Sequence, residues 1–300
     1  MKIFESYSPL DEVNSPAFLS PPSYWQEKWQ KIKRNRSFLA SCGVLLSLIG
    51  FAIIGPYLTL YPYDEMNLAF KNLPPSTKFW FGTDELGRDL FTRCCWGARV
   101  SILVGFAASL IDVFIGVSYG MIAGVAKRSI SEWMMRFIDV VQSIPYLLIV
   151  ILLVVVMGPG LLTIIVALAL TGWINMARIV RVQVLQLKNQ EFILAAQGYG
   201  ASKLRILNRY ILPHISGTVL MILTASLPTA LFTEAFLSFL GLGVQAPVAS
   251  WGTLANDGLL ALRYYPWRLF FPASLIFLSI FCLNIIGDGL RDVFDEKVKR

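Results

Sequence analysis

An uncharged stretch of 23 residues, FLASCGVLLSLIGFAIIGPYLTL at 38–60, most constrains how this chain can fold. A helix rises 1.5 Å per residue, so the stretch is long enough to cross the roughly 30 Å hydrocarbon layer of a membrane. Only helices and closed barrels satisfy their backbone polar groups in that layer. The strands of a barrel would alternate polar and apolar residues, and this stretch does not. The sequence therefore predicts membrane-spanning helices.

Apolar windows of this kind recur along the chain and predict about six spans. Hydrophobic residues make up 56% of the 300 positions and charged residues 15%, too little polar material to coat a soluble globule. Pro145 falls inside the third window, where a proline is expected to kink the helix. The predicted fold class is an all-α polytopic membrane protein. The windows lie near 38–60, 101–126, 138–157, 160–177, 216–240 and 269–288.

The basic residues orient these spans. With the N-terminus in the cytoplasm, most of the 26 Lys and Arg residues fall in cytoplasmic segments, so the positive-inside rule places both termini there. The net charge of +7 is therefore explained by the basic residues of the cytoplasmic segments, which set the topology. Because the basic residues are spread over several loops, they do not form the single basic face of a nucleic-acid-binding protein.

The predicted organisation follows from the spans. A cytoplasmic tail contains Trp25, Trp29 and Ile32 on one helical face, which suggests a helix in the headgroup layer. The alternative is a charged segment beside the first span with ordinary interfacial tryptophans. The predicted segments are the tail at 1–37, the first span at 38–60, an outer loop at 61–98, a core of five spans at 99–290 that includes a cytoplasmic loop at 178–215, and a C-terminal tail at 291–300.

The two loops at 61–98 and 178–215 are longer than the two to eight residues that usually connect helices in a bundle. In the inner loop, helical apolar spacing is interrupted near Gly200 and resumes in a short amphipathic stretch before Pro213. Small residues around Ala195 allow another protein to approach closely. This pattern predicts a docking helix.

The order A-A-x-x-x-G and then L-P in this loop resembles the cytoplasmic EAA loop of ABC-importer permeases, which docks on the ATP-hydrolysing subunit. Leu194 stands where that loop usually has a glutamate. Glu191 lies one turn earlier, and whether it takes over the positioning role stays open. The resemblance implies an ATPase-docking set of Leu194, Ala195, Ala196, Gly200, Ala201, Ser202, Lys203, Leu204, Leu212 and Pro213.

Four further blocks resemble the C-type permease subunit of oligopeptide and dipeptide importers. Together they cover the chain from about Phe81 to Lys297, with Glu296 where that family commonly has a proline. The resemblance implies the MetI-like permease fold of type I ABC importers. The blocks are FGTDELGRDLFTRCCWGARVSILVG at 81–105, MRFIDVVQSIPYLL at 135–148, TEAFLSFLGLGVQAPVASWGTL at 233–254 and IGDGLRDVFDEK at 286–297.

This resemblance also implies function, partners and location. It implies a permease that forms half of a peptide pathway in the bacterial inner membrane, working with a B-type permease subunit, two cytoplasmic ATP-binding subunits and an extracytoplasmic substrate-binding protein. ATP and Mg would be used by the ATPase partners, since the sequence has no G-x-x-x-x-G-K-[ST] phosphate loop. The chain itself would bind no cofactor and catalyse no reaction. Nickel, glutathione and antimicrobial peptides remain alternative substrates.

An outer-face motif precedes the second span, where the resemblance implies docking of the substrate-binding protein. Its glycines permit turns, and its charged residues predict a local ion-pair network. A simple solvated connector is the alternative. The motif consists of Gly82, Asp84, Glu85, Gly87, Arg88 and Asp89.

Acidic residues inside the spans form a second candidate set, because an ionised acid at the bilayer centre costs about 3 kcal/mol and usually faces protein or water. Glu234 is predicted to make a hydrogen bond within the bundle or to line the pathway; Asp112 is predicted to pack against neighbouring helices or line the cavity. Gly241 and Gly243 predict either a gate segment or an ordinary glycine-capped helix end. The candidate pathway or gate set is Glu234, Ser238, Gly241, Gly243 and Asp112.

Two rival functions stay open. In a proton-coupled transporter, Asp112, Glu234 and Asp288 would relay the ion. In a scaffold without transport activity, the inner loop would only recruit a cytoplasmic protein. No metal site is predicted, because His214 stands alone and the four cysteines lack zinc-binding spacing.

Overall fold

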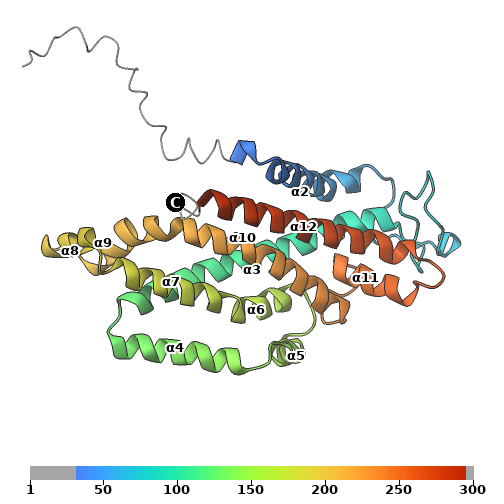
Figure 1. Cartoon of the computed structure of the whole chain (residues 1–300). Helices are drawn as coiled ribbons and strands as arrows, with labels where there is room; N and C mark the ends of the chain where they lie inside the picture. Colours follow the sequence, from blue (N-terminus) through green and yellow to red (C-terminus); the bar gives the residue numbers. More distant parts are fainter. Residues whose placement is uncertain (1–31, 295–300) are drawn as a thin grey trace, which may run out of the picture.

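The computed structural model describes residues 32–294, which form a bundle of helices (Figure 1). Within this range the backbone forms no strand, only an isolated bridge between Thr83 and Asp89, so the all-α prediction is confirmed. The elements are α2 (Arg36–Ile54), η2 (Gly55–Tyr57), η3 (Leu68–Phe70), α3 (Leu90–Val125), α4 (Arg128–Ser143), α5 (Tyr146–Met157), α6 (Leu161–Thr171), α7 (Trp173–Leu187), α8 (Glu191–Gly198), α9 (Lys203–Ile206), the π-helical turn η4 (Leu207–Ile211), α10 (Leu212–Phe239), α11 (Trp251–Leu260) and α12 (Trp267–Phe294).

Five helical segments of the described chain are long and apolar enough to cross a membrane. A sixth span results if α4 and α5 are counted as one, although they are bent by 78° at their junction. The count of five or six agrees with the predicted six. The five segments are Arg36–Tyr57, Leu90–Val125, Leu161–Leu187, Lys203–Phe239 and Trp267–Val293.

The third predicted window differs most from the structure, since Pro145 breaks the helix instead of kinking it. Ile144 has an extended conformation with ψ of 124°, as expected before a proline, which disfavours helical geometry in the preceding residue. The apolar residues before the break form one face of α4, where Trp133, Phe137 and Val140 are exposed. A hydropathy window cannot distinguish such a face from a continuous span.

The second, fourth, fifth and sixth spans are longer than their apolar windows. The helix predicted from 101 begins at Leu90, because Asp89 caps its first turn and accepts a hydrogen bond from the Thr92 N–H at 2.9 Å. On the opposite side, α7 continues to Leu187, and α9, η4 and α10 form one helical run from Lys203. Most of the predicted inner loop is therefore a helical extension of two spans.

A row of glycines brings α3 and α7 into close contact. A Cβ added at Gly116 would lie 2.6 Å from the Met176 Cβ, and one at Gly120 would lie 2.6 Å from the Ala177 carbonyl oxygen. At Gly124 it would meet Val184 at 2.5 Å. Spacing of four residues puts these glycines on one helical face, so the two backbones pack closely.

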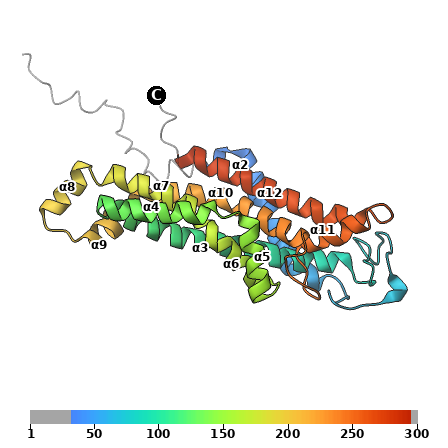
Figure 2. The same cartoon turned by 90° about the horizontal axis from the view of Figure 1, so that it is seen from below.

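The long helices run roughly along one axis, which separates the two large loops (Figures 1 and 2). α8 and α9 form one end of the molecule, while residues 55–89 and α11 lie at the other. The predicted inner and outer segments therefore occupy opposite ends of the bundle. The predicted headgroup helix with Trp25 and Trp29 lies outside the described residues.

Candidate functional site

The predicted docking element folds into α8 followed by a tight turn at Gly200. Gly200 has a φ of +78°, a left-handed conformation that glycine adopts without steric cost. Its N–H donates to the Gln197 carbonyl at 2.9 Å, and the Ala201 N–H donates to the Ala196 carbonyl at 3.0 Å. These two bonds form the Schellman arrangement that ends a helix at a glycine. The glycine of the A-A-x-x-x-G pattern is therefore the residue that ends α8.

α8 and α9 lie at one tip of the molecule (Figure 2), and they carry exposed apolar side chains there. Phe192, Leu194 and Tyr199 are exposed, and Leu204 extends the surface onto α9. Ala196, in contrast, is buried, so it packs inward and takes no part in the exposed face. The exposed members of the predicted docking set are Leu194, Ala195, Gly200, Ser202, Lys203, Leu204, Leu212 and Pro213, while Ala201 is half-buried.

Contacts with two spans hold α8 in place. Ile193 is fully buried in a cluster that includes Val184 of α7 and Ile211 of η4. The Phe192 ring stacks on His214 of α10 with centroids 4.9 Å apart. Because α8 contacts both the end of α7 and the start of α10, a force on α8 reaches two membrane-spanning segments.

Three other residues of the resemblance have defined positions in this region. Leu212 and Pro213 lie where the π-helical turn η4 passes into α10, so the amphipathic stretch before Pro213 continues into the span instead of ending there. Glu191 lies in the first turn of α8, where a negative charge complements the helix dipole.

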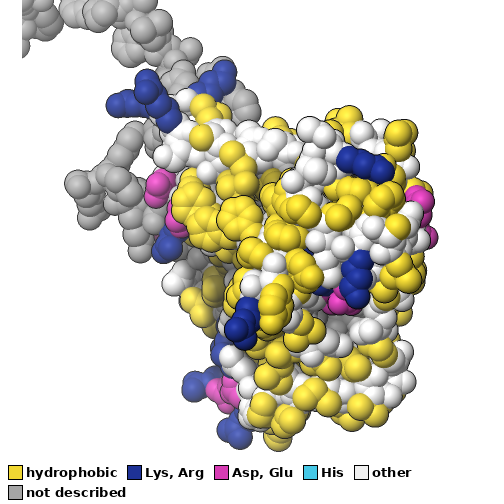
Figure 3. All heavy atoms as spheres, turned by 90° about the vertical axis from the view of Figure 1, so that its right-hand side faces the viewer, with side chains coloured by type: hydrophobic (Ala, Val, Ile, Leu, Met, Phe, Trp, Pro, Cys, Tyr) yellow, Lys and Arg dark blue, Asp and Glu magenta, His cyan; other side chains and the backbone are white. Residues whose placement is uncertain are grey.

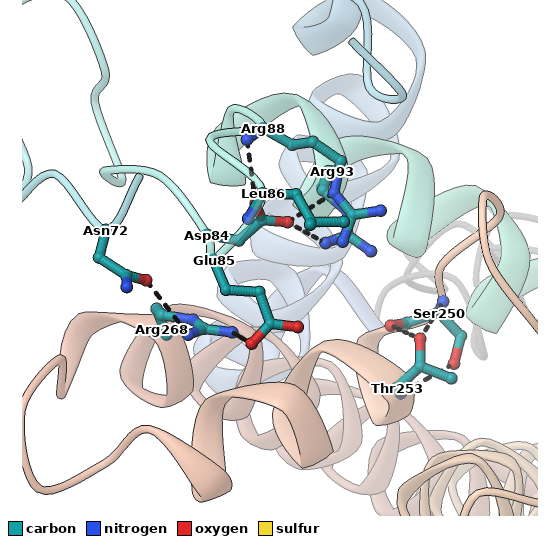
Figure 4. Close-up of polar contacts among 9 residues, drawn as sticks. All are labelled: Asn72, Asp84, Glu85, Leu86, Arg88, Arg93, Ser250, Thr253 and Arg268. Atoms are coloured by element: carbon teal, nitrogen blue, oxygen red, sulfur yellow. Dashed lines mark hydrogen bonds and ion pairs between the residues drawn. The ribbon is translucent and has the colours of Figure 1, made fainter. Parts of the chain in front are cut away.

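At the end of the bundle that is predicted to face outward, Asp84 is the centre of a buried polar cluster (Figure 4). Its Oδ1 accepts hydrogen bonds from the N–H groups of Leu86 and Arg88, both at 2.9 Å. Its Oδ2 accepts from Arg88 Nε at 2.7 Å and also from Arg93 of α3. Burial alone raises the pKa of Asp84, but the Arg93 and Arg88 charges and these hydrogen bonds outweigh it and hold the pKa below its ordinary value.

The remaining acids of the motif have different partners. Asp89 makes no ion pair in the described chain and instead caps α3, as Thr92 donates to it from both N–H and hydroxyl. Burial raises the pKa of Asp89, and the Thr92 bonds lower it in part. Glu85 lies 3.6 Å from Arg268 of α12, which also donates to Asn72 at 3.3 Å (Figure 4). The predicted network therefore includes Asp84, Glu85 and Arg88 but not Asp89.

Sequence reasoning missed the partners of this cluster. Arg93 and Arg268 are buried, and Asp257 of α11 faces Arg93. Burial raises the pKa of Asp257, and the Arg93 charge lowers it in part. The signal available in the sequence for Arg93 was a charged residue at the start of a long, largely apolar stretch.

The two glycines of the motif, Gly82 and Gly87, lie where no other residue fits well. Gly82 and Gly87 have φ of +79° and +73°. A Cβ at Gly82 would lie 2.6 Å from the Leu73 carbonyl oxygen, and one at Gly87 would collide with the Asn67 carbonyl. The outer loop is thus a defined structure and not a loose connector. Figure 3 shows this end of the molecule, where apolar side chains cover much of the surface between a few charged groups.

Glu234 lies fully buried in α10, with its Oε1 accepting a hydrogen bond from the Ser238 hydroxyl at 2.8 Å. Ser101 of α3 and Ser250, the cap of α11, also face this carboxylate. Glu234 does not line the cavity of about 370 Å³ between α3, α6, α7 and α10. This geometry favours a hydrogen bond within the bundle over a place in the pathway.

The helix end that follows is a glycine cap. Gly241 has a φ of +81°, its N–H donates to the Ser238 carbonyl at 3.1 Å, and the Leu242 N–H donates to the Leu237 carbonyl at 3.0 Å. Gly243 then packs directly against the Ser238 side chain. Of the two predictions for this segment, the capped helix end is confirmed, and the gate role stays a prediction.

After the cap, the chain returns into the bundle through α11. The Trp251 side chain is fully buried, and its Nε1 donates to the Cys94 carbonyl of α3 at 2.9 Å. Gly97 leaves room for it, since a Cβ there would lie 3.1 Å from the indole. α11 is therefore fixed against α3 as well as α10 and α12.

Asp112 lies in the interior of α3 and is 6% exposed. It lines a cavity of about 370 Å³ between α3, α6, α7 and α10, together with Tyr146, Asn175 and Thr229. Its carboxylate also contacts the backbone at Gly172, where a Cβ would collide with it. Both predictions for Asp112, packing against helices and lining the cavity, describe its position. Sequence reasoning did not identify Tyr146 or Asn175.

The other ionisable candidates do not assemble into a metal site within residues 32–294. Cys94, Cys95 and Cys282 are buried free thiols, and Cys42 is a half-buried one. Asp288 is exposed near the inner end of α12.

Comparison with known proteins gives two family matches. Residues 116–300 match the model described as binding-protein-dependent transport system inner membrane component. Residues 23–75 match the N-terminal TM domain of oligopeptide transport permease C.

Named relatives cover nearly the whole chain. The dipeptide transport system permease protein DppC of Bacillus subtilis is 51% identical over 97% of this chain and 90% of its own length. OppC of the same organism is 51% identical over 93% and 91%, and OppC of Escherichia coli K12 is 42% identical over 92% of both chains.

Among solved structures, an inward-facing form of the MetNI methionine ABC transporter matches with a TM-score of 0.53 at 18% identity, over 68% of this chain and 96% of the other. This likeness supports the MetI-like fold. The family model covers more than half of the chain, and the permease relatives match it almost from end to end. The chain therefore belongs to the family of binding-protein-dependent transport system inner membrane components and is a multi-pass inner-membrane permease of the oligopeptide and dipeptide transport type.

Proposed function

We propose that this chain forms half of the translocation pathway of an ATP-driven importer of dipeptides and oligopeptides. The relatives at 51% identity are named for dipeptide and oligopeptide transport, which supports peptide as the substrate over nickel or glutathione. The other half would come from a B-type permease subunit. The observation that carries the proposal is the exposed apolar surface of α8 at the end of two helices that continue into the bundle.

In this proposal, two cytoplasmic ATPases bind and hydrolyse ATP with Mg, and one of them holds α8. This chain binds neither ATP nor Mg. When the ATPases close, α8 moves with its ATPase and carries α7 and α10 with it, because Ile193 and Phe192 fix α8 to both. The bundle then changes between two packings, which opens the pathway to the opposite side of the membrane.

The proposal also sets the orientation. If α8 docks on a cytoplasmic ATPase, the opposite end of the bundle faces the exterior, where a substrate-binding protein delivers peptide to the ordered outer loop around Asp84. Both termini are then cytoplasmic, as the distribution of Lys and Arg favours.

Reconstitution tests this function. The chain is placed in vesicles with its B-type subunit, the two ATPases and the binding protein, and uptake of a labelled dipeptide and tripeptide is followed with and without ATP. We expect accumulation against the gradient that needs ATP and is not reduced by an uncoupler. Uptake without the ATPases, or uptake abolished by the uncoupler at constant ATP, would instead support a proton-coupled transporter. Accumulation of nickel or glutathione in place of peptide would overturn the substrate assignment.

A further inference from the structure

One buried carboxylate of the described bundle has neither an ion-pair partner nor a hydrogen-bond donor. Asp112 is 6% exposed, its Oδ1 lacks a hydrogen-bond partner, and none of the ion pairs in residues 32–294 includes it. A buried carboxylate normally has a cation or several donors beside it, because burial strips it of water. The missing partner therefore requires an explanation.

The space in front of this carboxylate is a cavity lined by both polar and apolar side chains. Its volume of about 370 Å³ lies within the roughly 300–1,000 Å³ range of ligand sites. Asp112 is the one carboxylic acid of the lining, and the lining includes no Lys, Arg or His. Hydroxyl and amide groups surround it, namely those of Tyr146, Thr171, Asn175, Ser226, Thr229 and Thr233.

The cavity continues toward the break between α4 and α5. A second cavity of about 240 Å³ lies there, and it shares Tyr146, Thr171 and Asn175 with the first. The shared side chains bring donors and acceptors that suit a peptide backbone. Together the two cavities give room for an extended ligand with one end at Asp112.

The carboxylate has a fixed position in this space. It occupies the volume that a side chain at residue 172 would take, so Gly172 makes its placement possible. Gly172 also joins α6 to α7, the helix that leads to α8. The Asp112 carboxylate therefore faces a group bound in the cavity. It also lies next to the junction of α6 and α7, and α7 leads to the docking helix α8.

We propose that Asp112 is a specificity-determining residue that receives an ammonium group of the peptide in transit. This inference rests on the proposed peptide transport. An ammonium group would give the carboxylate the partner that it lacks, with a positive charge and three N–H donors. Two parts of a peptide carry this group, the N-terminus and a lysine side chain.

The first experiment measures the charge without transport. In a background with the four native cysteines replaced, Thr229→Cys places a thiol in the cavity lining, and its rates of reaction with a cationic and an anionic thiosulfonate reagent are compared in the purified complex. We expect the cationic reagent to be favoured by at least about tenfold, since an ionised carboxylate in the same lining attracts the cationic reagent and repels the anionic one. Adding Asp112→Asn should bring the ratio close to one. A matched control, Ser109→Ala, removes a buried hydroxyl of α3 outside the lining and should leave the ratio unchanged.

The second experiment measures selectivity in the reconstituted importer. Two peptides with free N-termini are compared, one without lysine and one with it, and binding to the binding protein is measured separately. If Asp112 receives the N-terminus, Asp112→Asn lowers uptake of both peptides by about tenfold or more. If it receives lysine, only the second peptide is affected.

Several results would overturn the inference. The first is that the cationic and anionic reagents react at equal rates with the Thr229→Cys thiol when Asp112 is present. The second is that the ratio of the two rates stays the same after Asp112→Asn. The third is that Asp112→Asn leaves the uptake of both peptides unchanged. If the unsubstituted complex imports no peptide at all, the proposed function fails, and the reagent ratio still decides whether the cavity attracts cations.

Discussion

The carboxylate of Asp84 contacts the guanidinium group of Arg93 at the outer end of α3, where both side chains are buried. The pair joins the outer turn to the first membrane-spanning turns of α3, nine residues further along the chain. Arg88 makes a second contact with the same carboxylate. The shape of the outer face therefore depends on one carboxyl group that serves two arginines.

Asp84→Asn should destabilise the protein strongly, because it leaves two buried arginines without their negative partner. Removing one member of a buried pair costs about 3–5 kcal/mol. Thermal unfolding of the purified subunit in detergent measures the loss. Glu132→Gln, in an exposed pair with Arg128, is the control and should change the melting temperature little. Equal melting temperatures for the two variants would contradict the importance of the cluster.

Acidification should weaken the same cluster. Since the pKa of Asp84 is lower in the folded state than in the unfolded state, its stabilising contribution is complete above the unfolded value of about 3.9. The contribution is lost as the pH falls through the lower folded pKa. The free energy of unfolding is measured from pH 6 down to pH 2. Below about pH 4, acidification should therefore lower it less for Asp84→Asn than for the natural sequence. Parallel curves would show that Asp84 does not contribute.

Gly120→Leu should disrupt the contact between α3 and α7, since the new side chain would meet the Ala177 carbonyl oxygen and Val180. Overpacking of a tight interface costs about 1–3 kcal/mol, and more where backbone must move. Thermal unfolding in detergent is again the measurement. Gly43→Leu on α2, where no atom lies within 4 Å of the added Cβ, is the matched control. A stable Gly120→Leu protein would mean that the two helices can separate at little cost.

Gly200→Trp should detach the ATPase while leaving the subunit in the membrane. No atom of this chain lies within 4 Å of a Cβ at Gly200, so the bulk of the tryptophan meets the partner. The measurement is copurification of the ATPase. Gly241→Trp controls for backbone strain, because Gly241 also has a positive φ and open space but lies at the far end of α10. ATPase recovered in full with Gly200→Trp, or lost equally with both variants, would argue against docking at α8.

Single cysteines should report the orientation. In a cysteine-free background, Tyr199→Cys and Leu60→Cys each place a thiol at a position that is 94% exposed, at opposite ends of the bundle. An impermeant maleimide should label the Leu60→Cys variant in intact cells and the Tyr199→Cys variant only in inverted vesicles. The reverse pattern would place α8 outside and exclude a cytoplasmic ATPase as its partner.

Much of the fold follows from apolar windows, because a membrane span must be long, apolar and helical. The break before Pro145 shows where this reasoning stops. The apolar face of α4 and the apolar helix α5 read as one window, and only the backbone at Ile144 reveals two helices. Similarly, Arg93 and Arg99 interrupt the apolar pattern over the first turns of α3, although Asp84 pairs with Arg93, and Arg99 donates to the carbonyls of Ala52 and Ile53.

For the candidate sites, contiguous motifs were informative and distant contacts were not. The turn at Gly200 depends on residues within one short stretch, so its pattern was visible in the sequence. Arg268 joins Asn72 across 196 positions, and no local pattern marks such a pair. The cavity at Asp112 likewise needs side chains from α5, α6, α7 and α10, which only the packing of the bundle brings together.

The uninterrupted length of α3 has a mechanical consequence. Its 36 residues form a rod about 54 Å long with no proline and no break between the outer cluster and the inner end that packs along α7. A rod of this length that pivots by about 5° about one end displaces the other by nearly 5 Å, roughly the pitch of one helical turn. In the proposed orientation, a small tilt imposed from the cytoplasm would thus be geometrically sufficient to shift the surface proposed to meet incoming cargo.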